Sequence, residues 1–403
     1  MNLLYNDINT VSIVFNIFFE LRGSFLKEKI VAKIKSTENN MITYADYMSL
    51  ALYDPEIGYY MKTNKKLGTE GDFYTSSGVH SVFGQVFAHF FLDVIEKEGL
   101  PPMICEFGGG DGRFAKAVMD EWERLKPEGN EDLSYVIIEM SPYHREEQKK
   151  LLANNEGFRQ YDSLNSLKQQ MGEEFKGIIF SNELIDAFPV HVVEKCRDYL
   201  YEIYVSVDES DELTEKYQLC TDERILSWLC SYAPTLKEGQ RIEVPLYMNQ
   251  WITEINEFMN KGLLLTIDYG YTKEQWQMAE RKDGSLRGYF KHQLINNPLL
   301  HPTEMDITSH IHIDAYNEIT KENNFNKVID LRQNRFLLMI GILKFLQENH
   351  DPNPFSEKSK LNRAIQTLIN DSGMSAAFHV FVHSKQLTET DHYRFLIEDP
   401  YKM

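Results

Sequence analysis

The chain has 403 residues, of which 42% are hydrophobic, and it carries a formal net charge of −19 at pH 7. A chain of this length can bury a large core and form one elaborated domain or two closely packed ones. The negative charge argues against nonspecific binding to nucleic acid or to an anionic membrane, because phosphate contacts need clustered Lys and Arg.

The N-terminal residues include one apolar run, from Val11 to Phe19, which Asn16 interrupts. The run is too short to cross a bilayer, and no basic cluster precedes it as in a signal peptide. We interpret it as an accessory helix or an extension. We therefore expect a soluble, cytoplasmic protein without stable membrane insertion.

Residues 24–52 show the helical spacing of apolar side chains, and Asn39 and Asn40 divide this pattern into two helices. Residues 53–80 are rich in Gly, Asp, Ser and Thr, which predicts loops that reach a ligand site. A further helix is expected from about Val82 to Glu98.

From Pro101 onward, short apolar strands alternate with longer helices, which is typical of a parallel sheet covered on both faces. The predicted strands are Met103 to Phe107, Tyr135 to Glu139, Gly177 to Ser181, Leu263 to Asp268 and Phe378 to His383. A helix follows the first strand, because Phe114, Val118, Trp122 and Leu125 keep a spacing of three to four residues. The pattern predicts an α/β fold with a doubly wound sheet.

Residues 190–260 separate the third and fourth predicted strands, and this gap is too long for a simple crossover. The segment contains a strand-like run from Tyr199 to Val207 and a helical run from Ile225 to Tyr232. We therefore expect an inserted subdomain here.

The four cysteines are widely spaced and form no CxxC pair, so we expect neither a zinc site nor a disulfide framework. They are Cys105, Cys196, Cys220 and Cys230. Cys105 lies in a strongly apolar run, which predicts a small core residue rather than a nucleophile.

The strongest local signal is the segment EFGGGDGR, which begins at Glu106 where the first predicted strand turns into a helix. Gly108, Gly110 and Gly112 allow a sharp turn and the close approach of a ligand. Dinucleotide-binding proteins hold pyrophosphate on a similar turn, but the carboxylates of Glu106 and Asp111 would repel it. They suit a ligand with an ammonium and a sulfonium, such as S-adenosylmethionine, so a nicotinamide enzyme is disfavoured.

Glu139 ends the second predicted strand, where a carboxylate can accept hydrogen bonds from both hydroxyls of an adenosyl ribose. The alternative is that Glu139 is a charge at the N-terminus of the helix that follows.

Polar side chains also follow the third and fourth predicted strands, at the edge of the sheet where α/β proteins bind ligands. Asn182, Glu183 and Asp186 follow the third strand, and Asp268 and Tyr269 follow the fourth. We expect three carboxylates around an incoming cation. Paired with a guanidinium, they would hold its nitrogen in line with the methyl group and favour loss of its proton. Alternatively, Asp186 caps the next helical turn.

Seven segments together resemble the MidA family of S-adenosylmethionine-dependent methyltransferases, over roughly residues 25–385. They are ITYADYMSLALYDPEIGYY from Ile42, GDFYTSSGVHSVFGQ from Gly71, EFGGGDGR from Glu106, SNELIDAFPV from Ser181, LLLTIDYGY from Leu263, GSLRGYFKHQLINNPLLHPTEMDITSHI from Gly284 and QNRFLLMIGI from Gln333. Their number and order make the resemblance more specific than the glycine turn alone.

The resemblance implies a class I methyltransferase core, Rossmann-like, with an inserted subdomain that faces the substrate. Residues 1–80 would form a helical extension and a loop covering the cofactor, and residues 81–190 the first part of the S-adenosylmethionine-binding core. Residues 191–260 would form the insertion, and residues 261–403 the second part of the core with segments on the acceptor side.

The resemblance also implies roles for individual residues. Gly108, Gly110 and Gly112 would line the cofactor, Glu139 would bind its ribose, and Asp72, Thr75 and Ser76 would form the wall above it. Asn182 and Glu183 would lie beside the methyl group, while Tyr269 and His310 would shape the acceptor cleft. From the residues alone, Asp306 to His310 is equally compatible with a helix cap.

Two departures from the family pattern fall near the presumed acceptor side. Ser76-Ser77 replaces the usual Ser-Pro, and Gly288 stands where the family has Cys in a Leu-Arg-Cys-Tyr segment. Both change the stiffness of loops. The expected function is methylation of an arginine in a protein acceptor, with no nucleic acid partner and with a homodimer as one arrangement. The alternatives are a cofactor-binding assembly factor with little turnover and a small-molecule methyltransferase.

Overall fold

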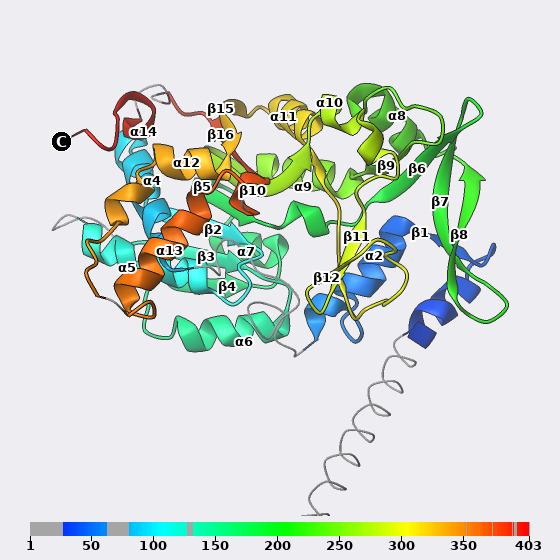
Figure 1. Ribbon diagram of the computed structural model, residues 1–403, viewed down its shortest axis with the longest axis horizontal. Coiled ribbons are helices and arrows are strands. Elements are labelled where there is room, and N and C mark those ends of the chain that lie inside the picture. Colours follow the sequence, from blue (N-terminus) through cyan, green and yellow to red (C-terminus); the bar gives the residue numbers. More distant parts are fainter. Residues whose placement is uncertain are drawn as a thin grey trace, which may run out of the picture.

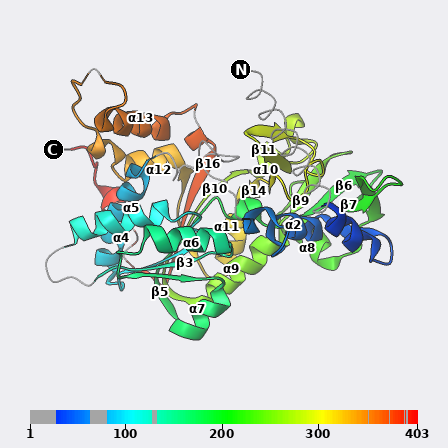
Figure 2. The same ribbon diagram turned by 90° about the horizontal axis from the view of Figure 1, so that it is seen from below.

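The computed structural model describes residues 27–62, 80–126, 132–351, 353–372, 374–388, 390 and 393–402. These residues form two lobes that lie side by side (Figure 1), and the larger lobe contains a sheet with helices on both faces (Figure 2). Within these ranges, no helix combines the length and the apolar character needed to cross a bilayer.

The central sheet has the strand order β15-β16-β10-β5-β2-β3-β4, with β14 beside the end of β10. The strands are β2 (Met103–Phe107), β3 (Ser134–Ile138), β4 (Phe158–Tyr161), β5 (Phe175–Asn182), β10 (Met259–Tyr271), β14 (Ile311–His312), β15 (Asn326–Arg332) and β16 (Phe378–Lys385). The strands from β10 to β4 are parallel, whereas β16 is antiparallel to β10 and β15. The predicted doubly wound α/β fold is confirmed. Chain order changes direction between β2 and β5, which places a crevice at their carboxyl ends.

Helices cover both faces of this sheet because its strands are apolar on both sides. One core contains α4 (Val82–Glu98), α5 (Arg113–Leu125), α12 (Gln333–Met339) and α13 (Glu357–Ile369), and the other contains α7 (Leu164–Met171), α8 (Glu223–Tyr232), α9 (Leu246–Phe258) and α11 (Ile313–Glu322). Along β5, Ile178 and Phe180 belong to the first core and Ile179 to the second. Cys105 is fully buried in the second core, as predicted, and all four cysteines are free thiols.

The second lobe is built on an antiparallel sheet of the order β1-β7-β6-β9, and β8 also pairs with β7. Its strands are β1 (Met41–Thr43), β6 (His191–Cys196), β7 (Tyr199–Val207), β8 (Leu213–Leu219) and β9 (Arg241–Val244). Ile42 of β1 lies opposite Val205 of β7, so the N-terminal segment and the insertion share one sheet. The division of the chain at residues 80, 190 and 260 stays a prediction, and the pairing of β1 with β7 crosses the first two of these boundaries.

The helix α2 (Tyr44–Tyr53) follows β1 and joins the two parts of this lobe. Thr43 and Asp46 form a capping box at its start, which satisfies backbone N–H groups of the first turn. Its Tyr44 hydroxyl donates a hydrogen bond to Glu215 of β8, and Glu215 also pairs with Arg241 of β9. Two helices were expected here, and the predicted break at Asn40 is confirmed, although the short β1 was not predicted.

A small sheet of β11 (Arg287–Phe290), β12 (Gln293–Ile295) and β13 (Asp306–Thr308) lies between the lobes (Figure 1). In its register, Arg287 lies opposite Thr308 and Tyr289 opposite Asp306. The interpretation of residues 306–310 as a helix cap does not match the structure, because Asp306–Thr308 form β13 and α11 begins only at Ile313 without a side-chain cap.

The remaining elements are short or lie at the periphery. They are α6 (Pro142–Leu151), α10 (Lys273–Trp276), α14 (Arg394–Ile397), η1 (Tyr59–Met61), η2 (Ile185–Ala187), η3 (Ala279–Arg281), η4 (Ile342–Phe345) and η5 (Met374–Ala376).

A cluster of phenylalanines packs beneath the crevice and fixes the ends of β2 and β5 against α4 and α5. Phe180 is fully buried, and its ring stacks on Phe114 with the centroids 4.4 Å apart. Phe87 and Phe91 of α4 contact the same ring at 5.7 and 6.0 Å.

We predict that Phe180→Ala lowers the free energy of unfolding by about 3–5 kcal/mol, because it removes a ring that the closely packed neighbours cannot replace. Phe180→Leu should cost less than about 1.5 kcal/mol. Urea denaturation followed by circular dichroism measures both. As a control, Phe355→Ala should change stability by less than about 0.5 kcal/mol, since Phe355 is 74% exposed. Equal effects at positions 180 and 355 would contradict the described packing.

Candidate active site

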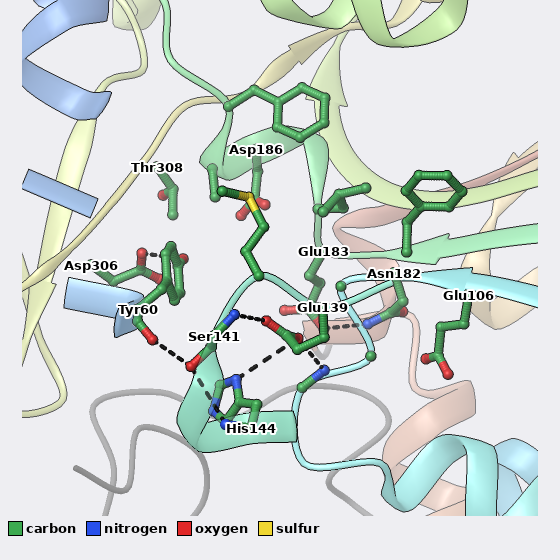
Figure 3. Close-up of a pocket in the computed structure, with 18 of the residues that line it drawn as sticks. Tyr60, Glu106, Glu139, Ser141, His144, Asn182, Glu183, Asp186, Asp306 and Thr308 are labelled. Carbon is green, nitrogen blue, oxygen red and sulfur yellow. Dashed lines mark hydrogen bonds and ion pairs between the residues drawn. The ribbon is translucent and has the colours of Figure 1, made fainter. Parts of the chain in front are cut away.

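A cavity of about 910 Å³ opens where the carboxyl ends of β2, β3, β5 and β10 meet α2, β11 and β13 (Figure 3). Its position is the crevice expected for ligands of a doubly wound sheet. The volume is that of pockets which enclose cofactor-sized molecules.

The glycine-rich turn after β2 forms the floor of one side. Gly108, Gly110 and Gly112 all have positive φ, of 70°, 52° and 83°, as their predicted role in a tight turn requires. A Cβ on Gly108 would lie 2.9 Å from Leu184 Cδ1. Gly108 and Gly110 line the cavity, whereas Gly112 lies at the start of α5 and does not.

Glu139 lies directly after β3 and is bound to two backbone amides. Its Oε2 accepts a hydrogen bond from Gly110 N at 3.0 Å, and its Oε1 accepts one from Ser141 N at 2.8 Å. Ser141 is the N-cap of α6, so Glu139 also lies near that helix N-terminus. Figure 3 shows Glu139 pointing into the cavity beside His144. Ribose binding by Glu139 stays a prediction.

Glu106 is the penultimate residue of β2 and is almost fully buried. Only 4% of it is exposed, and Tyr135 donates a hydrogen bond to its Oε2 at 2.9 Å. Burial raises the pKa of Glu106 to about 8, and the neighbouring charges of Glu139 and Asp111 add to this. Glu106 is therefore mostly protonated at pH 7 until a cation lies beside it.

Asp111 lines the cavity, but its charge is compensated by Arg113, whose Nη2 lies 2.5 Å from Asp111 Oδ2. The repulsion of a pyrophosphate that was predicted for Glu106 and Asp111 is therefore reduced at Asp111.

Asn182 and Glu183 follow β5 and converge with Glu139 on the centre of the cavity (Figure 3). Glu183 has a φ of 52°, which is unfavourable for a residue with a Cβ. Its N–H donates to Ile267 O at 2.9 Å, and its Oε1 accepts from Asn182 Nδ2 at 3.1 Å. Strained backbone of this kind is concentrated at functional sites.

Asp186 lies in η2 and is 5% exposed. Burial raises its pKa to about 6, although a hydrogen bond from Tyr269 opposes the shift. Its Oδ1 has no hydrogen-bond partner within the part of the chain that the structure describes. At pH 7 it is mostly ionised and can accept a proton.

Asp268 lies elsewhere than predicted, below η2 and outside the lining of the cavity. Its Oδ2 accepts hydrogen bonds from the backbone N–H groups of Ile185 and Asp186 at 2.9 and 3.2 Å, and its Oδ1 accepts one from Tyr269 N at 2.9 Å. Burial and the charge of Asp186 raise the pKa of Asp268. Asp268 thus caps the turn that carries Asp186, and it does not line the cavity. Asp186, for which a capping role was the alternative, lines the cavity.

The opposite wall comes from the second lobe and from β11 and β13, and most of it was missed in the sequence. Tyr60 donates a hydrogen bond to Asp306, and the rings of Tyr53 and Tyr60 stack at 5.5 Å. The Tyr53 hydroxyl donates to Ala187 O at 2.8 Å, which ties this wall to η2. Both tyrosines lie in the segment from Ile42 that resembles the MidA family. Their place at the site could be recognised only from the tertiary structure.

His310 was predicted at this wall, and it lines the cavity together with Tyr269. Its ring stacks on Tyr271 at 4.2 Å and lies 4.7 Å from Tyr269. Burial lowers the pKa of His310 well below its usual range, and Arg287 and Arg281 lower it further. His310 is therefore neutral.

Most of the predicted site residues come together in this one cavity. Those that line it are Glu106, Gly108, Gly110, Glu139, Asn182, Glu183, Asp186, Tyr269 and His310. Asp72, Thr75, Ser76 and the Ser76-Ser77 departure lie outside the described residues. The other departure, Gly288, is packed against Met305, where a Cβ would lie 2.3 Å from the sulfur.

The charge of the cavity is strongly negative. Among the described residues that line it, eight carry a carboxyl group and one, Arg287, carries a guanidinium. The carboxyl groups belong to Glu106, Asp111, Glu139, Asp162, Glu183, Asp186, Glu254 and Asp306. This balance suits a cationic ligand.

Curated relatives match most of the chain at low identity. A zebrafish (Danio rerio) protein named protein arginine methyltransferase NDUFAF7, mitochondrial, is 25% identical over 90% of this chain and 87% of its own length. The human protein of the same name is also 25% identical, over 87% and 81%. The Drosophila melanogaster homolog is 26% identical over 72% and 68%.

These names contradict the predicted cytoplasmic location, because the relatives are mitochondrial proteins. The prediction was wrong because composition and the lack of a membrane span do not distinguish one aqueous compartment from another.

Two solved structures from Burkholderia thailandensis have the same fold. One, bound to S-adenosyl-homocysteine, has a TM-score of 0.82 at 25% identity, covering 92% of this chain and 95% of that chain. The other, a native crystal structure, has a TM-score of 0.78 at 24% identity, covering 91% and 93%.

A family model described as "Putative S-adenosyl-L-methionine-dependent methyltransferase" matches residues 86–329, which is more than half of the chain. The match includes the glycine turn, Glu139, η2 and the β11–β13 wall. It confirms the resemblance inferred from the motifs and the expected cofactor. The chain belongs to this family of S-adenosyl-L-methionine-dependent methyltransferases.

Proposed function

We propose that this methyltransferase acts on an arginine side chain of another protein. The observation that carries the proposal is the excess of carboxyl groups around the cavity, which favours a cationic acceptor. The names of the curated relatives support the same acceptor. A homodimer stays a prediction.

In this proposal the cofactor lies along the carboxyl ends of β2, β3 and β4. Glu106 binds the ammonium, Glu139 the ribose hydroxyls, and the turn at Gly108 and Gly110 lies against the chain between them. Asp162, which lines the cavity directly after β4, accepts a hydrogen bond from the adenine amino group. The fit is supported by the turn at Gly108 and Gly110, which have positive φ and line the cavity, and by carboxylates placed for a cationic ligand.

The acceptor guanidinium lies between Glu183 and Asp186, with the second lobe opposite. Methyl transfer breaks the bond between sulfur and the methyl carbon and forms one between that carbon and a guanidinium nitrogen. The nitrogen loses a proton, which Asp186 Oδ1 accepts, since this oxygen has no protein partner in the described residues. Glu183 and Asn182 hold the nitrogen in line with the methyl group.

The test is methyl incorporation with radiolabelled S-adenosylmethionine into lysate of a strain that lacks the gene, followed by mass spectrometry of labelled proteins. Label on an arginine supports the proposal. Label only on small molecules favours a small-molecule methyltransferase, and no label with intact cofactor binding favours an assembly factor.

Glu183→Gln and Asp186→Asn should each lower kcat by about 10²–10⁴-fold, because each removes a carboxylate that aligns or deprotonates the acceptor. Binding of S-adenosylhomocysteine, measured by calorimetry, should change by less than about threefold. The matched control is Glu257→Gln, an exposed carboxylate on α9 that does not line the cavity. Unchanged kcat in both site variants would exclude the assigned roles.

Binding of S-adenosylmethionine should release a proton from Glu106 at pH 7. The pKa of Glu106 in the unliganded protein is about 8, and the ammonium of the ligand favours the charged carboxylate. Affinity should therefore rise from pH 6 toward pH 8, by up to about tenfold per pH unit, and fall above pH 8 as the ligand's own ammonium loses its proton. Calorimetry in two buffers with different ionisation enthalpies measures the released proton.

The amine of the ligand also titrates in this range, and the variant Glu106→Gln separates its contribution from that of the protein. This variant should lack the proton release that comes from Glu106. Equal proton release by the variant and the wild type would show that Glu106 does not meet the ammonium.

A further inference from the structure

Arg287 of β11 lines the cavity and has no carboxylate partner within the described residues. Within the described residues it is the one guanidinium that lines the cavity, and it forms no ion pair with any of the eight carboxyl groups around it. Arg287 is only partly buried, and the planar fork of its guanidinium matches carboxylates. An unpaired Arg287 in so acidic a cavity therefore needs an explanation.

Two neutral acceptors hold the side chain and leave one nitrogen available. Arg287 Nε donates to Ser285 O at 3.0 Å, and Nη2 donates to His310 Nδ1 at 2.9 Å. The neutral ring of His310 can accept this bond, and stacking on Tyr271 fixes its orientation. Nη1 forms no protein hydrogen bond in the described ranges.

The loop that precedes Arg287 is itself fixed by a buried carboxylate. Glu243 is 1% exposed, and it accepts hydrogen bonds from Ser285 N, Ser285 Oγ and Leu286 N at 2.9, 2.9 and 3.1 Å. Ser285 Oγ in turn accepts one from His310 N at 2.9 Å. Gly284 has a φ of 78°, and a Cβ there would lie 2.3 Å from Glu243 Oε1. The position of Arg287 is therefore built into the fold.

We infer that Arg287 binds a carboxylate of the protein acceptor, from an Asp or Glu within two residues of the methylated arginine. This inference rests on the proposed function. In the β11–β13 register, Arg287 lies opposite Thr308 and Tyr289, two residues on, lies opposite Asp306, so Arg287 belongs to the same wall as Tyr289 and Asp306. The acceptor, rather than the methionine end of the cofactor, lies at this wall.

The inference is tested by binding of short peptides to the protein loaded with S-adenosylhomocysteine, measured by fluorescence polarisation without turnover. Each peptide contains one arginine. In one set a single Asp is stepped through the two positions on either side of it, and in the matched set Asn replaces that Asp. The wild type should bind the best Asp peptide about tenfold more tightly than its Asn counterpart, as expected for one charge-assisted pair.

Arg287→Gln should reduce this preference to less than about twofold, and Arg287→Lys should keep part of it because it keeps the charge. The matched control is Arg281→Gln, which should retain the full preference. Arg281 stacks over Tyr271 at 4.2 Å but does not line the cavity. Thermal denaturation of each variant separates loss of recognition from loss of fold.

Three results would overturn the inference. Equal binding of Asp and Asn peptides by the wild type would show that Arg287 does not bind a carboxylate of the acceptor, while the proposal of an arginine acceptor would stand. A weakening of S-adenosylhomocysteine binding by Arg287→Gln of tenfold or more, with the peptide preference unchanged, assigns Arg287 to the cofactor. Failure of the wild type to bind any arginine peptide overturns the proposed function as well.

Discussion

Mutual repulsion among carboxyl groups is the constraint on which the site depends. Eight of them surround a cavity of about 910 Å³, where the low dielectric strengthens every repulsion. The fold compensates in two ways. Backbone N–H groups from Gly110 and Ser141 bind Glu139, and Arg113 pairs with Asp111. Burial also raises the pKa of Glu106 to about 8, so this group mostly keeps its proton at pH 7. A cationic ligand can therefore replace the proton on Glu106.

The two lobes contribute different parts of this arrangement. The parallel sheet supplies groups at strand ends, whose positions follow from backbone geometry and vary little. The second lobe supplies Tyr53 and Tyr60, and the small β11–β13 sheet completes the opposite wall, which the hydrogen bond from Tyr53 to Ala187 joins to η2. We expect cofactor recognition to reside in the first part and acceptor recognition in the second.

The larger lobe could be predicted from the sequence because its signals are local. The bounds of α4 and β2 agree with the predicted ranges, since apolar periodicity and helix signals specify them, and so do those of β7 in the second lobe. The edge strands β4 and β15 were missed because half-exposed edge strands carry polar residues. β1 was missed because three residues are too few to show a period.

Within the site, residue identity predicted that polar groups gather at the strand ends, but not which way each one points. Asp268 and Asp186 both follow apolar strands, yet one caps a turn and the other faces the cavity. That difference arises from the path of η2, which no local pattern specifies. Tyr60 and Asp306 are far apart in sequence, so their hydrogen bond could not be inferred without the tertiary fold.

The pairing of β1 with β7 also has a consequence for biosynthesis. Ile42 leaves the ribosome early, whereas its partner Val205 is made only after the first half of the chain. Until then, the apolar side chains of α2 lack the sheet that buries them, and long-range pairing of this kind is slow. The apolar face of α2 should therefore stay exposed on the nascent chain until the insertion that carries β7 has been made.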